Sequence, residues 1–209
     1  MALALVLPGG ASAEPLRVAM LGDSLTQGYG LLPEAGLVAQ LQRWLDAREA
    51  GVVLVNAGVS GDTTAGGAAR VAWTLDGGAD ALVVALGGND LLRGFDPAET
   101  RANLHAILAA ADARDVPVLL VGMAAPGNYG PGFKADFEAI FPDLADEFGA
   151  GLVPDMLAPL RAEAGNPGAM GRLMQPDGLH PSGEGVALIV EALGPAVLAL
   201  AEKAGEVGN

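Results

Sequence analysis

The sequence predicts an α/β domain built around a five-stranded parallel sheet. Five short apolar segments recur along the chain with helical patterns between them, and strands that alternate with helices pair in parallel through right-handed crossovers. Apart from Arg17 and Asp80 near their starts, the segments carry no charged residue and do not alternate, as strands do when helices cover both faces of a sheet. They occupy residues 16–21, 52–55, 80–86, 117–122 and 151–153.

The composition indicates a folded globular domain and argues against a nucleic-acid partner. Of 209 residues, 51% are hydrophobic and 17% are charged, which is enough apolar sequence to bury a sizeable core. The net charge of −14 argues against a nucleic-acid partner, because a phosphate backbone is bound by clustered Lys and Arg. The absence of cysteine from the sequence excludes disulfides, thiolate nucleophiles and thiolate metal sites.

The two ends of the sequence are expected to lie outside the domain. Residues 1–14 contain a short apolar run and then Ala-Ser-Ala at 11–13, a small-x-small pattern typical of signal-peptide cleavage, although no basic residue precedes the run. We expect an export-signal remnant or a disordered N-terminus there, a single domain over 15–204 and a disordered tail over 205–209. This predicts a periplasmic or secreted protein, with a cytoplasmic one as the alternative. No other apolar run reaches 18 residues, so we expect no integral membrane span.

Ser24 stands at the first strand-to-helix turn. The segment 16–21 ends at Gly22, and the sequence GDSLTQGYG then leads into a helix. In an open parallel sheet this turn lies at the carboxyl edge of the strands, where such folds bind ligands. A serine there is placed as a nucleophile, although serine is also a common helix N-cap. Both interpretations remain open until a base and an oxyanion site are found.

A second strand leads into a turn of the same kind. A buried helix face is predicted between Pro33 and Gly51, because apolar residues stand at 37, 38, 41, 44 and 45. Strand 52–55 follows, and the sequence NAGVSGDTT then opens a predicted helix over 63–77.

Gly61 lies in that second turn. Its backbone N–H can approach a ligand closely, and the N-terminus of the next helix adds partial positive charge. The alternative is that Gly61 only relieves backbone strain while Asp62 or Thr63 caps the helix.

Asn89 follows the third strand. Segment 80–86 ends in Gly-Gly-Asn-Asp, which delivers a side-chain amide to the same edge as Ser24 and Gly61. An amide donor there can bind a developing oxyanion. Asparagine is also a common turn former, so a purely local role remains an alternative.

The fourth unit contains a helix and a long loop. Asp96 as N-cap and Pro97 at the first helical position predict a helix to about Arg114. His105 lies within it among Ala and Leu, which favours a surface or packing role over catalysis. After strand 117–122, the glycine- and proline-rich loop 123–132 is interpreted as a flap over an acyl chain, with a plain linker as the alternative. A helix is expected over 133–148.

The last part of the chain supplies a candidate base. Within residues 155–176, Met156, Leu157, Leu160 and the segment 170–174 are interpreted as lining of an apolar cleft, although methionine also fills gaps in cores. His180 follows in the sequence DGLHPS. Asp177 precedes it by three residues across a glycine, so one turn brings the carboxylate to one imidazole nitrogen and leaves the other free.

These candidates together form a complete set for acyl transfer. Ser24 is the nucleophile, His180 the base and Asp177 its orienting carboxylate, while the Ser24 and Gly61 backbones and the Asn89 amide are the oxyanion donors. In this order the residues resemble the four marker residues of the SGNH, or GDSL-type, hydrolase family. The resemblance covers about residues 16–200, and the loop sequence APGNYG is similar to that of its bacterial acyl-thioesterase, lysophospholipase and arylesterase branch.

The resemblance implies a flavodoxin-like three-layer α/β/α sandwich with a five-stranded parallel sheet. It implies hydrolysis of carboxylic esters or acyl thioesters, with no metal or organic cofactor, by a monomer or weak dimer. The glycines of loop 123–132 make that loop more flexible and less charged than in the branch. Six residues are expected to contact the small-molecule substrate: Asp23, Leu25, Met123, Pro126, Tyr129 and Leu179.

Other functions are weighed against this one. A nucleotide-binding module would need a phosphate-cradling motif such as G-x-x-x-x-G-K-[ST], which the sequence lacks. A carbohydrate O-deacetylase of the same family would need aromatic sugar platforms, and the aromatic content is only 4%. A catalytically silent lipid- or carbohydrate-binding relative is the remaining alternative.

Overall fold

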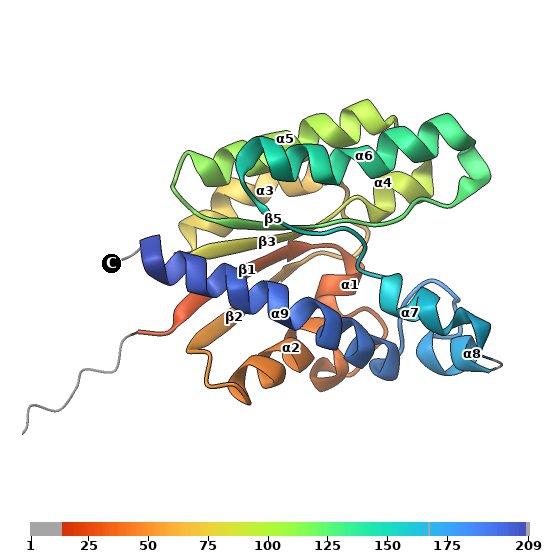
Figure 1. The fold of residues 1–209 in the computed structure, drawn as a ribbon, viewed down its shortest axis with the longest axis horizontal. Helices are drawn as coiled ribbons and strands as arrows, with labels where there is room; N and C mark the ends of the chain where they lie inside the picture. Colours follow the sequence, from red (N-terminus) through yellow and green to blue (C-terminus); the bar gives the residue numbers. More distant parts are fainter. Residues whose placement is uncertain (1–13, 167, 208–209) are drawn as a thin grey trace, which may run out of the picture.

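The structure, a computed structural model, describes residues 14–166 and 168–207, and five parallel strands form its sheet (Figure 1). The strand order β2-β1-β3-β4-β5 is the flavodoxin-like order, in which ligands bind beside β1 and β3, where the direction of winding reverses. The expected fold class is therefore confirmed. The expected export segment lies outside the described residues except for Glu14. The strands are β1 (Leu16–Gly22), β2 (Val52–Gly58), β3 (Ala81–Ala85), β4 (Val118–Val121) and β5 (Gly151–Val153).

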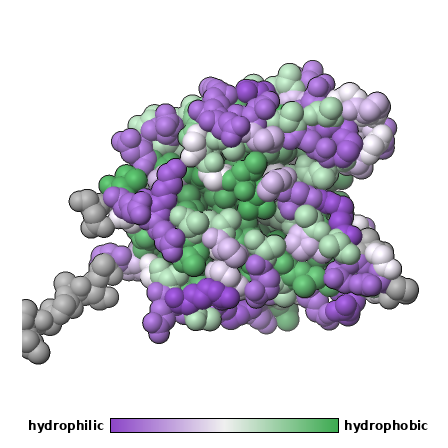
Figure 2. Space-filling view, viewed as in Figure 1, coloured by the Kyte–Doolittle hydropathy of each residue, from purple (hydrophilic) through white to green (hydrophobic). Residues whose placement is uncertain are grey.

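Helices pack on both faces of the sheet and make three layers (Figure 1). One face carries α2 and α9, and the other carries α3, α5 and α6. In Figure 2, hydrophilic residues cover the outer surfaces of both helix layers, and apolar residues gather between the layers. The helices are α1 (Ser24–Gln27), α2 (Leu37–Asp46), α3 (Thr64–Asp76), α4 (Gly88–Arg93), α5 (Pro97–Asp112), α6 (Pro131–Phe148), α7 (Ala158–Ala162), α8 (Ala169–Leu173) and α9 (Gly183–Val207).

Neighbouring residues of the central strands enter different cores. In β1, Val18 and Met20 join the core under α2 and α9, whereas Ala19 and Leu21 join the core under α3, α5 and α6. All four side chains are at most 2% exposed. Because the central strands are buried on both faces, their buried residues form continuous apolar stretches and do not alternate with polar ones.

Several expected boundaries differ from the structure. Asp96 caps α5 as expected. Helices α4, α7 and α8 are not predicted by the sequence pattern. Loop 123–132 is shorter than expected, since α6 already begins at Pro131. Proline suits the first position of a helix because its φ is fixed near the helical value and it has no N–H to leave unpaired.

The last helix corrects the expected start of the C-terminal tail and bears on the expected absence of a membrane span. The tail was expected to start at residue 205, but α9 continues to Val207 with Ala204 still buried, because no proline or polar cluster interrupts the apolar face there. By length and composition, α9 also passes as apolar enough to cross a membrane, although charged residues interrupt its apolar sequence. Half of its most apolar stretch is buried inside the fold, as in a core helix, where it packs on β1, β3 and β4.

Candidate active site

The turn after β1 places Ser24 at the carboxyl edge of the sheet. The β strand ends at Gly22, and a Cβ at that position would lie 2.0 Å from the Thr26 hydroxyl oxygen, so the sharp turn requires glycine. Asp23 is the N-cap of α1, and its Oδ1 accepts the Leu25 N–H at 3.0 Å. Ser24 is therefore the first residue of the helix and not its cap.

A chain of hydrogen bonds joins Ser24 to His180 and Asp177. The Ser24 Oγ lies 2.9 Å from His180 Nε2, and His180 Nδ1 lies 2.7 Å from Asp177 Oδ2. The His180 side chain is 13% exposed, so most of the imidazole is shielded from water. The three side chains have the connectivity that a nucleophile, a base and an orienting carboxylate require.

The turn before α9 holds the Asp177 carboxylate in its ionised form. Its Oδ1 accepts the backbone N–H groups of Leu179 at 2.9 Å and His180 at 3.0 Å. Chiefly the His180 N–H, with the imidazole and the Leu179 N–H adding to it, lowers the pKa of Asp177 from 3.8 to about 2. An ionised carboxylate at Nδ1 keeps the proton on that nitrogen, which leaves Nε2 of a neutral imidazole as the acceptor facing Ser24.

Gly61 and Asn89 border the same cavity as Ser24. Gly61 has φ +78°, and its carbonyl oxygen accepts a hydrogen bond from Arg93 Nη2 at 2.8 Å. Thr63 is the N-cap of α3, as one of the two interpretations of this turn expected. Gly61 nevertheless borders the cavity. Asn89 lies in the first turn of α4 rather than in an isolated turn.

The Asp23 carboxylate is buried next to Asn89. It is 4% exposed, and its Oδ2 lies 3.4 Å from Asn89 Nδ2. Burial raises the pKa of Asp23 from 3.8 to about 6, against the opposing effects of the Leu25 N–H and the nearby His180. The Asn89 amide, the candidate oxyanion donor, is therefore hydrogen-bonded to a carboxylate whose pKa is raised to about 6.

A cavity of about 390 Å³ opens over these groups. All six expected substrate contacts border it, namely Asp23, Leu25, Met123, Pro126, Tyr129 and Leu179. The residues that border it mostly come from the segments that follow β1, β3 and β4, and the apolar ones among them, such as Leu25, Leu91 and Met123, form a wall in the cavity that Ser24 borders. A volume of this size is in the range of small-molecule sites.

The expected cleft lining from residues 155–176 is mostly wrong. Leu157 borders the large cavity, and Met156 borders only two small neighbouring pockets. Leu160 and Leu173 are buried in the core under α9, and Met170 is 42% exposed. Leu160 of α7 and Leu173 of α8 fill the core, so their hydrophobicity reflects packing.

His105 is remote from the cavity. Its Nε2 lies 3.2 Å from Glu147, and its ring packs edge-on against Phe148 on the outer face of α5 and α6. The expected surface and packing role agrees with these contacts.

Three residues near the site were not expected from the sequence. Tyr29 borders the cavity with its ring 4.7 Å from that of His180, Arg93 holds the Gly61 carbonyl, and Gln175 donates to the Tyr29 carbonyl. Tyr29 stands between two glycines in GYG, the one local signal that pointed to it.

Arg70 of α3 ties together the turns that carry Ser24 and Gly61. Its Nη2 donates to the Gly22 carbonyl at 2.9 Å, its Nη1 to the Ala57 carbonyl at 2.7 Å, and its Nε to Asp62 at 2.8 Å. One planar guanidinium therefore fixes the ends of β1 and β2 relative to each other.

The chain is similar to several known proteins over most of its length. The GDSL-like Lipase/Acylhydrolase family model matches residues 20–188. Esterase TesA of Pseudomonas aeruginosa is 39% identical over 173 residues, which are 82% of each chain. The thioesterase 1/protease 1/lysophospholipase L1 of Escherichia coli K12 is 37% identical over 82% of this chain and 77% of its own. The crystal structure of AlinE4, an SGNH-hydrolase family esterase, is 41% identical with a TM-score of 0.72 over 90% of this chain and 98% of its own. The chain thus belongs to the GDSL-like lipase/acylhydrolase family.

Proposed function

We propose that the protein is a serine esterase that hydrolyses carboxylic esters and acyl thioesters through an acyl-enzyme on Ser24. The observation that carries the proposal is the hydrogen-bond chain from Ser24 through His180 to Asp177, set at the side of a 390 Å³ cavity with an apolar wall. The names of the relatives, an esterase and a thioesterase/lysophospholipase, support the same class of bond.

The first half of the reaction acylates Ser24. Its Oγ attacks the substrate carbonyl carbon while His180 Nε2 accepts the hydroxyl proton, and the carbonyl electron pair moves to oxygen. When the tetrahedral intermediate collapses, the C–O or C–S bond breaks, and His180 returns the proton to the leaving alcohol or thiol. A water molecule then repeats the cycle on the acyl-enzyme and releases the acid.

The oxyanion is assigned to three donors that border the cavity. They are the backbone N–H groups of Ser24 and Gly61 and the side-chain amide of Asn89. Within residues 14–166 and 168–207, neither of these two N–H groups donates to a protein acceptor, so both are available to a ligand. Ser24 also lies at the N-terminus of α1, whose first N–H groups lack intrahelical acceptors.

A hydrolysis panel tests the proposal. It compares p-nitrophenyl esters and acyl thioesters of about two to sixteen carbons with an acetylated sugar, since the apolar wall favours an acyl chain over a sugar. The wild-type protein is expected to hydrolyse members of both series and to be labelled by a fluorophosphonate at Ser24, whereas Ser24→Ala does neither. Turnover confined to acetylated sugars would favour a carbohydrate O-deacetylase, and failure of labelling would favour a silent binding relative.

The same proposal extends to location and organisation. Because Ala-Ser-Ala at 11–13 resembles a cleavage site, we place the protein in the periplasm or outside the cell, as one domain that starts near residue 15 and acts as a monomer or weak dimer. Cell fractionation, N-terminal sequencing of the mature protein and gel filtration test these points. An intact N-terminus in the cytoplasmic fraction would contradict the export.

A further inference from the structure

The Ser24–His180 hydrogen bond joins segments that lie 156 residues apart in the sequence. Proton transfer between the two side chains requires a heavy-atom distance of about 2.6–3.2 Å. The relative position of the Ser24 turn and the His180 loop must therefore be fixed by contacts other than the catalytic bond itself.

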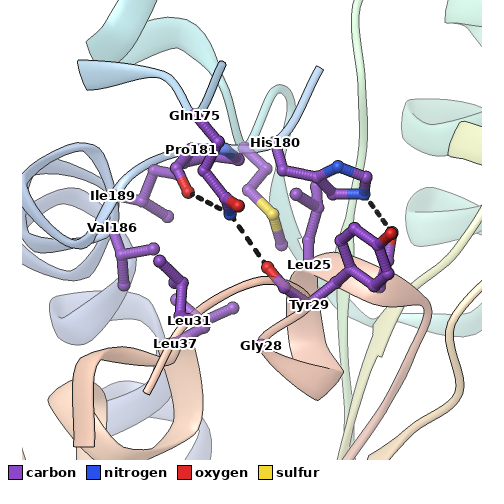
Figure 3. Close-up of a pocket in the computed structure, with 12 residues that line it drawn as sticks. Leu25, Gly28, Tyr29, Leu31, Leu37, Gln175, His180, Pro181, Val186 and Ile189 are labelled. Atoms are coloured by element: carbon purple, nitrogen blue, oxygen red, sulfur yellow. Dashed lines mark hydrogen bonds between the residues drawn. The ribbon is translucent and has the colours of Figure 1, made fainter. Parts of the chain in front are cut away.

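Gln175 lies where the two segments meet. Its Nε2 donates to the Tyr29 carbonyl at 2.8 Å and to the Pro181 carbonyl at 3.0 Å. Figure 3 shows this amide between the Tyr29 and Pro181 segments. Its backbone N–H donates to the His180 carbonyl at 2.8 Å, and its carbonyl accepts the Gly178 N–H at 3.0 Å. One residue thus closes the loop that carries Asp177 and His180 and also binds that loop to the Ser24 side.

The bond to Tyr29 also concerns the imidazole. The Tyr29 ring lies 4.7 Å from the His180 ring with the planes tilted by 38°. By holding the Tyr29 backbone, Gln175 holds the aromatic ring that flanks the base. Apolar side chains from α2 and α9 gather next to this amide in Figure 3, around a pocket of only about 10 Å³. The bond to Tyr29 is exposed, whereas the bond to Pro181 is partly buried.

The absence of a side chain at Gly30 leaves room for the Gln175 amide. Its φ is +73°, and a Cβ at this position would lie 2.1 Å from Gln175 Oε1. The turn after Tyr29 thus has both the backbone conformation and the space that the amide needs.

We infer that Gln175 is a positioning residue for the proposed esterase reaction, which sets the distance between the Ser24 hydroxyl and the His180 imidazole by bridging the Tyr29 and Pro181 carbonyls. The inference rests on the proposed function. It assigns no contact with substrate to Gln175, because the residue acts through the two loops that it joins.

Two isosteric variants test this role. Gln175→Glu replaces the donating nitrogen by an oxygen that faces two carbonyls, and Gln175→Met keeps the length without any donor. Each is expected to lower kcat about 10- to 100-fold while KM changes by less than about threefold, because misplacement of the base slows the chemical step and leaves the acyl cavity intact. The rate of fluorophosphonate labelling at Ser24 is expected to fall by the same factor.

Gln42 provides the matched control. Its Nε2 also makes two hydrogen bonds, to the Val52 carbonyl and to Asp46, and its Oε1 accepts the Leu54 N–H, all away from the cavity. Gln42→Glu is expected to lower the melting temperature as Gln175→Glu does, with kcat unchanged at a temperature where both proteins are folded.

A second pair of variants approaches the contact from the other side. Gly30→Ala places a methyl group against Gln175 Oε1 and is expected to give the same fall in kcat. Gly51→Ala controls for the positive φ alone, since Gly51 has φ +62° and no atom within 4 Å of the added Cβ.

The outcomes separate this inference from the proposed function. A wild-type protein that neither hydrolyses esters nor is labelled would refute the proposed function. If the wild-type protein is active and the folded Gln175 and Gly30 variants keep kcat within about twofold, the positioning role is wrong while the esterase assignment stands. An equal loss of kcat in Gln42→Glu would also refute it, since the effect would then follow stability.

Discussion

The Asp23 carboxylate lies 3.4 Å from the amide nitrogen of Asn89, and both residues border the cavity next to Ser24. Because burial raises the pKa of Asp23 to about 6, the native state binds a proton more tightly there than the unfolded chain, whose pKa is near 3.8. The contribution of this group to the free energy of unfolding therefore decreases as pH rises from about 4 to 6 and stays low above that range.

Asp23→Asn is expected to remove this pH dependence. We compare the free energy of unfolding of the variant minus that of the wild type at two pH values. This difference should be about 1–3 kcal/mol more positive at about pH 7.5 than at about pH 4. Any change in the hydrogen bond to Asn89 adds a term that is independent of pH and cancels between the two pH values. Urea unfolding of both proteins at the two pH values measures it, and equal differences at both would contradict the prediction.

The two histidines are expected to respond very differently to mutation. Ser24→Ala and His180→Ala should each lower ester turnover by at least about 10³-fold with little effect on folding, because each removes a participant in the proton transfer. His105→Ala should leave kcat nearly unchanged, since its contacts are with Glu147 and Phe148 on the outer helix layer. Equal losses in the two histidine variants would contradict the assignment of the base.

Asn89→Ala tests the oxyanion assignment. The variant should lower kcat by about 10²- to 10³-fold with a much smaller change in KM, because the oxyanion exists only in the transition state. Steady-state kinetics with a p-nitrophenyl ester measure both constants. A change confined to KM would instead place the Asn89 amide in ground-state substrate binding.

Arg70 should contribute to stability more than a surface arginine does. Its side chain is 20% exposed and Asp62 is 12% exposed, so Arg70→Met removes the charged partner of a part-buried carboxylate and one donor from each of two carbonyls, at a cost of about 2–4 kcal/mol. In the control, Arg114→Met removes a pair with Asp76 that is 38% and 66% exposed and should cost at most about 1 kcal/mol. Denaturant unfolding compares the two, and similar losses would show that the Arg70 network adds nothing beyond a surface pair.

The strands and the candidate site residues could be predicted from the sequence for a shared physical reason. Both faces of the central strands β1, β3 and β4 are covered, so their buried residues appear as continuous apolar runs that are easy to delimit. Ser24, Gly61 and Asn89 each follow such a run by a few residues, and parallel strands bring their carboxyl ends to one edge. Asp177 and His180 are close in the chain, so one local turn sets their contact.

The contacts that the sequence did not reveal are those that depend on tertiary approach. Gln175 reaches Tyr29 across 146 residues, and nothing in the local sequence of either residue encodes that encounter. The short helices α4, α7 and α8 were missed because five or six residues give too few repeats for a helical period to be recognised. The methionine- and leucine-rich segment before Asp177 misled for a related reason, since core filler and cavity lining have the same composition.

The cavity combines two parts of different origin. The proposed catalytic groups lie after the ends of strands and in the loop that contains Gln175. Pro126 and Tyr129 instead belong to the connection between β4 and α6. The Tyr129 hydroxyl there donates a hydrogen bond to the Leu92 carbonyl at 3.3 Å. Substitutions in that connection can therefore retune which acyl lengths are accepted while the proton relay keeps its spacing. For engineering, selectivity and turnover become separate design variables in this scaffold.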